Sequence, residues 1–174
     1  MAVLLSPKGI APSHGRTSIY SAPKAMLTNV QWSLSEAIGT PINLNWKPQT
    51  LVPGTWRTSF SWNSDLGAGA RIASTLRGWH YLNFEVYEAA LNGSDGSLFL
   101  FTPELDLFRA TIGVHGDILL NEHQISSVIK NSSKGADLES NLERMLGVPW
   151  HEAIEPFRRM EMDEVPSNAD RIIV

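Results

Sequence analysis

The chain has 174 residues, of which 43% are hydrophobic, so it can bury one core within a single compact domain. Its 14 basic and 18 acidic residues give a formal net charge of −4, which argues against nucleic acid or an anionic membrane surface as a partner. The absence of cysteine excludes disulfides, thiolate nucleophiles and cysteine-bound zinc. Since the apolar run after Met1 has only four residues, we expect neither a signal peptide nor a membrane span, and we predict a cytoplasmic location.

The first half of the chain predicts strands and helices in alternation. The apolar residues of the first predicted helix share one stripe, Pro23 fits its first turn, and Gly39 ends it. Two segments that alternate between polar and apolar residues then flank a loop containing Pro53 and Gly54, as in a hairpin. The predicted elements are a strand at 16–21, a helix within 21–39, strands at 42–46 and 55–62, a helix within 63–79 and a strand at 80–88.

The order of these elements, βαββαβ, is that of the ferredoxin-like fold, in which two helices cover one face of an antiparallel sheet. We therefore predict an α+β fold of this kind, with an additional β-hairpin around His115 and with C-terminal helices. Asn121 and Gln124 match a capping box at the start of one such helix, and the apolar run 98–101 indicates a strand buried on both faces. The predicted organisation is a flexible N-terminal lead at 1–15, a single α+β domain at 16–160, and a C-terminal tail at 161–174 that docks through residues 172–174.

The stretch NSDLGAGARIASTLRGW, residues 63–79, opens its helix with two glycines. Gly69 falls on the buried stripe of the helical wheel, where a small residue lets the helix lie close to the sheet. Gly67 falls on the exposed side of the first turn, where free N–H groups could receive an anion, with Arg71 one turn further on. Because the stretch lacks the Lys-Ser/Thr pair of a P-loop, packing is the favoured interpretation. Binding of acyl-CoA or a nucleotide through Gly67, Gly69 and Arg71 is the alternative.

No constellation of catalytic or metal-binding residues stands out in the sequence. The five histidines are scattered, and none has a second ligand at metal-binding spacing. His115 and Asp117 fit a hairpin turn better than an acid–base pair. We therefore predict no catalytic residue, no metal site and no cofactor, and we do not expect the protein to be an enzyme.

The aromatic residues of the predicted helices suggest a surface for a partner. Trp32 lies roughly opposite the apolar stripe of its helix, so it either packs against a second layer, such as the C-terminal helices, or belongs to an interface. Trp150 and Phe157 belong to a short helix that Pro149 opens. The polar face of the predicted sheet, which includes Tyr87, is either a binding platform or a solvated surface.

Four stretches of the chain together resemble a known family. They are SAPKAMLTNVQWSLSEAIGTPINLNWKPQTLVPGTWRTSFSW, GAGARIASTLRGWHYLNFEV, TPELDLFRATIGVHGDILL and GVPWHEAIEPFR. Across roughly residues 16–160 they are similar to the actinobacterial domain-of-unknown-function family 3145. The resemblance implies a cytoplasmic protein without established catalytic residues, whose relatives are often encoded beside fatty-acid synthesis genes. It thereby implies a role near acyl carrier protein, the fatty-acid synthase or an acyl-CoA carboxylase.

The sequence supports two hypotheses about function, one of protein binding and one of small-ligand binding. The first is a non-catalytic interaction or regulatory protein that acts on a lipid-synthesis enzyme and uses Trp32, Trp150 and Phe157 as anchors. The second is a protein that binds a small phosphorylated ligand at Gly67 and Arg71. The first predicts a protein partner, and both leave the oligomeric state open.

Overall fold

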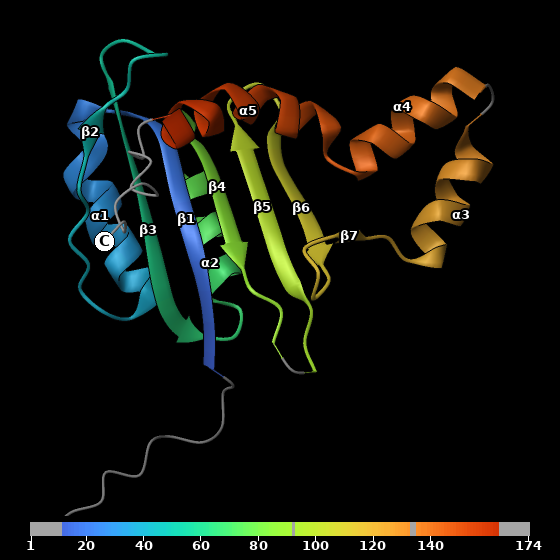
Figure 1. Cartoon of the computed structure of the whole chain (residues 1–174), viewed down its shortest axis with the longest axis horizontal. Helices are drawn as coiled ribbons and strands as arrows, with labels where there is room; N and C mark the ends of the chain where they lie inside the picture. The colour runs from blue at the N-terminus through green and yellow to red at the C-terminus, as the bar shows by residue number, and fades with distance from the viewer. Residues whose placement is uncertain (1–11, 92, 133–134, 164–174) are drawn as a thin grey trace, which may run out of the picture.

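The computed structural model describes residues 12–91, 93–132 and 135–163 of the chain. They form an α+β protein built on one seven-stranded antiparallel sheet with the strand order β2-β3-β1-β4-β5-β6-β7 (Figure 1). The strands are β1 (Pro12–Pro23), β2 (Lys47–Pro48), β3 (Thr55–Asp65), β4 (Asn83–Glu88), β5 (Gly96–Thr102), β6 (Asp106–Ile112) and β7 (Ile118–Leu119). The helices are η1 (Lys24–Met26), α1 (Leu27–Ile38), α2 (Ala68–Arg77), α3 (Glu122–Asn131), α4 (Gly135–Met145) and α5 (Val148–Asp163).

Helices α1 and α2 cover one face of the sheet and enclose the larger part of the core (Figure 1). The buried residues of α1 follow the helical period, at Val30, Leu34 and Ile38, and face the sheet. Gly39 ends this helix in the left-handed conformation, with a φ of 85°, as the sequence predicts. Stacked rings of Phe84 on β4 and Phe101 on β5, with centroids 5.1 Å apart, contribute to the same core.

Helix α5 crosses the other face of the sheet and encloses a second, smaller core (Figure 1). Ile154 is fully buried there, and the Trp150 ring stacks on Phe108 of β6 with centroids 5.1 Å apart. Further along the helix, Phe157 stacks on Tyr20 of β1 at 5.6 Å. The sheet is therefore covered on both sides, which explains why the run Leu98–Phe101 of β5 is buried throughout, as its apolar sequence predicts.

Helices α3 and α4 lie beyond β7, to the side of the sheet (Figure 1). No residue of α3 is buried. The predicted capping box at its start is confirmed, because the Asn121 side chain accepts from the Gln124 N–H and the Gln124 side chain accepts from the Asn121 N–H, both at 2.9 Å. Within the described part of the chain, no helix is both long enough and apolar enough to cross a membrane.

The predicted strand at 42–46 is wrong, because this segment runs beside α1 without joining the sheet. The Ile42 N–H donates to the Ser35 hydroxyl at 3.1 Å, and the Leu44 N–H donates to the Gln31 side-chain oxygen at 3.0 Å. These side chains of α1 satisfy backbone groups that a strand would pair with its neighbour. The strand that follows, β2, has only two residues.

The first strand is longer than its sequence suggests. It begins at Pro12, which lies opposite Asp65 of β3, so the sheet includes four residues that the sequence assigns to an N-terminal lead. It also continues to Pro23, and α1 consequently starts at Leu27. The chain order β1-α1-β2-β3-α2-β4 matches the predicted βαββαβ order, whereas the assignment to the ferredoxin-like class stays a prediction.

Candidate functional site

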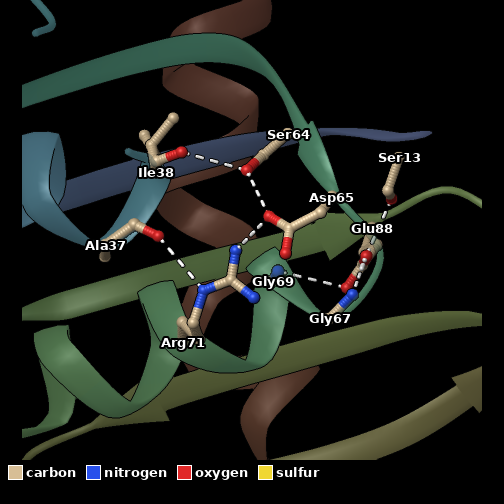
Figure 2. A network of polar contacts seen from close by, with 9 residues as sticks. All are labelled: Ser13, Ala37, Ile38, Ser64, Asp65, Gly67, Gly69, Arg71 and Glu88. Carbon is tan, nitrogen blue, oxygen red and sulfur yellow. Dashed lines mark hydrogen bonds and ion pairs between the residues drawn. The ribbon is translucent and has the colours of Figure 1, made fainter. Parts of the chain in front are cut away.

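The turn that opens α2 is held by a buried carboxylate. Glu88, the last residue of β4, is 3% exposed and accepts three hydrogen bonds. Its Oε1 accepts from the Ser13 hydroxyl and from the Gly67 N–H, both at 2.7 Å, and its Oε2 accepts from the Gly69 N–H at 3.1 Å (Figure 2). The negative side chain therefore caps the positive end of the helix and satisfies N–H groups that have no partner within the helix.

The positions of Gly67 and Gly69 each require glycine, for different structural reasons. Gly67 has a φ of 90°, a left-handed conformation that residues with a Cβ rarely adopt. A Cβ on Gly69 would lie 2.8 Å from Oε2 and 2.9 Å from Cβ of Glu88, so only glycine lets α2 approach β4 this closely. The prediction that Gly69 serves close packing of the helix on the sheet is confirmed.

Arg71 is engaged with other parts of the same chain. Its Nη2 lies 2.5 Å from Oδ1 of Asp65, and its Nε donates to the Ala37 carbonyl at 3.3 Å (Figure 2). The hydrogen bonds from Arg71 and Ser64 lower the pKa of Asp65. An acyl-CoA or nucleotide phosphate at this turn would compete with Glu88 for the N–H groups and with Asp65 for Arg71, so the geometry counts against the alternative of a ligand site.

Glu88 is not among the site residues predicted from the sequence, although the sequence contains a sign of its role. In the alternating segment of β4, Glu88 falls in phase with Phe84 and Val86, which are both fully buried. A carboxylate on the inward phase of a strand needs buried hydrogen-bond donors. The N–H groups of the following glycine-rich helix start are the donors that this fold supplies.

The three aromatic residues predicted to contact a partner lie in different environments. Trp32 projects from α1 with 65% of its surface exposed. Trp150 is 5% exposed, and its Nε1 donates to the Asp106 carbonyl at 2.8 Å. Phe157 is half-buried against Tyr20. The packing of Trp150 and Phe157 is accounted for within the chain, so Trp32 is the predicted anchor that is open to a partner.

A groove runs beside Trp32, between α1 and the loop that follows it. It has a volume of about 590 Å³, and its lining residues are Thr28, Gln31, Trp32, Ser35, Glu36, Gly39, Thr40, Pro41 and Ile42. Among these described lining residues, Glu36 is the one that carries a charge. The hydrogen bonds from the Ile42 and Leu44 N–H groups to Ser35 and Gln31 fix the loop against the helix, so the groove has a defined shape.

A polar network that the sequence does not predict attaches α5 to the sheet. The Glu85 carboxylate of β4 accepts from the Tyr20 hydroxyl at 2.9 Å and from Arg158 Nε at 2.8 Å. Burial and the neighbouring Glu85 raise the pKa of Tyr20. Burial and the Arg158 charge lower the pKa of His151, whose Nδ1 lies 3.1 Å from Arg158 Nη1. Tyr20 therefore remains a neutral donor, and the network serves to position the helix.

The described residues contain no group of three or more His, Asp or Glu side chains that could hold a metal ion. His115 lies in the β6–β7 turn, where Gly116 has a φ of 87° and the Gly113 N–H donates to the Asp117 carbonyl at 2.9 Å. The prediction that this segment forms a hairpin turn is therefore confirmed.

The fold and these surroundings define an α+β protein with an exposed tryptophan on a helix, beside a groove whose described lining includes one charged residue. The chain belongs to the family described as "Protein of unknown function (DUF3145)", whose model matches residues 17–167. No curated protein and no solved structure matches the chain.

Proposed function

We propose that the protein is a non-catalytic interaction or regulatory protein that binds a protein partner through the outer face of α1. The observation that carries the proposal is the 65% exposure of Trp32, a residue type that is usually well buried. Tryptophan is enriched among the residues that dominate binding energy at protein interfaces. A partner side chain or helix that covers this ring would remove a large apolar surface from water.

The surroundings of Trp32 support this proposal. Interface centres are depleted in charged residues, and among the described residues that line the groove beside the ring only Glu36 is charged. Its walls are already fixed by hydrogen bonds between the loop and α1, so a partner would not have to order them on binding. Val30 and Leu34 of α1 are fully buried in the core that this helix shares with α2 and the sheet.

For the partner, we propose a lipid-synthesis enzyme such as an acyl-CoA carboxylase or the fatty-acid synthase. This part of the proposal rests on the family resemblance of the sequence. We also propose that the first six elements form a ferredoxin-like unit, which serves as the scaffold that presents α1. Binding through one exposed helix requires no catalytic residue of this chain.

The Trp32→Ala variant tests the proposal. Because the ring is mostly exposed, we expect the free energy of unfolding to change by less than about 1 kcal/mol, as urea denaturation would measure. We expect affinity purification of the tagged variant from the producing organism to lose the enzyme subunit that the wild-type chain recovers. Tyr81→Ala is the matched control, since Tyr81 is also an exposed aromatic residue, at 67%. Recovery of the same subunit by wild type and Trp32→Ala would contradict the proposal.

A further inference from the structure

Two adjoining cavities lie on the face of the sheet that α5 crosses, opposite the α1 layer that bears Trp32. One has a volume of about 250 Å³ and the other about 360 Å³, and both are lined by Arg16 of β1 and Glu161 of α5. Arg16 Nη2 lies 3.6 Å from Glu161 Oε2. The two cavities therefore adjoin at this ion pair.

The described lining of the smaller cavity carries more positive than negative side chains. Its described lining includes the cationic side chains Arg16, Lys47 and Arg57, from three adjacent strands, and the single carboxylate of Glu161. Arg57 is only 6% exposed, so its charge lies at the floor of the cavity, where solvent screens it poorly. The hydroxyl-bearing residues Thr58 and Ser59 also line it. Guanidinium groups and hydroxyls are the donors that proteins use for carboxylate and phosphate.

The larger cavity is mainly apolar. Tyr20, Tyr87 and Met162 are among its lining residues. Besides Arg16 and Glu161, which it shares with the smaller cavity, its described charged residues are Glu85 and Arg158, which form an ion pair of 2.7 Å. It therefore provides an aromatic and aliphatic surface next to the smaller cavity without adding a net charge from that pair.

We propose that the two cavities form one binding site for a small organic anion. Its carboxylate or phosphate group lies among Arg16, Lys47 and Arg57, and its apolar or aromatic part lies against Tyr87 and Met162. Glu161 is the competing internal anion, because it holds Arg16 and accepts a hydrogen bond from Ser59 at 2.8 Å. The same chemistry could come from a free organic acid or from the carboxylates of Glu164 and Asp170, which follow α5 in the sequence.

A titration of the full chain followed by two-dimensional amide NMR tests this proposal. The probe is phenylacetate, and the comparison compounds are acetate, which lacks the ring, and phenylacetamide, which lacks the charge. We expect saturable shifts at residues 16–20, 57–59 and 160–162 with phenylacetate, weaker binding of acetate, and none of phenylacetamide. Arg16→Gln and Lys47→Gln should each raise the Kd about threefold or more, and both replace exposed residues that the fold does not require.

Two further variants sharpen the test. Glu161→Gln removes the competing carboxylate, so it should lower the Kd. Lys130→Gln makes the same change of charge as Lys47→Gln on the distant helix α3 and should leave the Kd unchanged.

The outcomes also separate the two sources of the anion. Binding to the wild-type chain supports an external acid as the ligand. Binding that is detected only after Glu164→Gln and Asp170→Asn are introduced together supports the chain's own carboxylates as the occupant. The proposal is overturned if phenylacetate binds neither chain, or if its Kd is the same in wild type, Arg16→Gln and Lys47→Gln.

Discussion

Replacing Trp150 by alanine is expected to lower the free energy of unfolding by about 4 kcal/mol, because the large ring is almost completely buried. The substitution removes the stacking contact with Phe108 and leaves a cavity between α5 and the sheet. It also leaves the Asp106 carbonyl without the hydrogen bond that Trp150 Nε1 donates. Urea denaturation monitored by circular dichroism measures the loss.

Trp32→Ala is the matched variant against which the destabilisation by Trp150→Ala is compared. Both variants remove the same indole ring from a helix, but Trp32 is 65% exposed and Trp150 is 5% exposed. We therefore expect a destabilisation several times larger at Trp150 than at Trp32. Equal and small effects would mean that Trp150 is not part of the core, and that it remains available as an anchor for a partner.

Replacing Glu88 by alanine is the second large expected effect, a loss of about 3 kcal/mol in the free energy of unfolding. The carboxylate accepts hydrogen bonds from Ser13, Gly67 and Gly69, and its removal leaves these three donors without an acceptor in a mostly buried turn. Thermal or urea unfolding checks the magnitude. Hydrogen exchange at the first turn of α2 should become faster than in the wild-type chain.

Two variants serve as controls for Glu88→Ala. Glu88→Gln keeps the shape of the side chain but presents an amide group to donors that need an acceptor, so we expect an intermediate loss. Glu104→Ala removes an exposed carboxylate and should change the free energy of unfolding by less than about 0.5 kcal/mol. A Glu88→Ala variant as stable as Glu104→Ala would contradict the role of Glu88 as the cap of α2.

The parts of the fold that depend on local sequence pattern could be predicted. The buried run Leu98–Phe101, the capping box at Asn121 and the end of α1 at Gly39 all follow from side-chain periodicity or from backbone requirements of a few adjacent residues. The α+β class followed from the alternation of such elements along the chain.

The parts that depend on distant contacts could not be predicted. The segment 42–46 alternates as a strand does, but Gln31 and Ser35 of α1 bind its backbone and keep it outside the sheet. The N–H groups that made the start of α2 a candidate anion site are occupied by Glu88, which lies 19 and 21 positions away in the sequence. Arg16, Lys47 and Arg57 are far apart in the sequence, and they line one cavity because the strands β1, β2 and β3 lie side by side in the sheet.

The measurement that tests the proposed interface most directly is site-specific photo-crosslinking from α1. Since the chain has no cysteine, Glu36→Cys introduces a single thiol in the groove beside Trp32 for a photoactivatable label. We predict that this position crosslinks in cell extract to the protein that co-purifies with the wild-type chain, and that adding Trp32→Ala abolishes the crosslink. Glu104→Cys, on the exposed turn between β5 and β6, should give no such product. Equal crosslinking from both positions, or crosslinking that survives Trp32→Ala, would contradict binding at the outer face of α1.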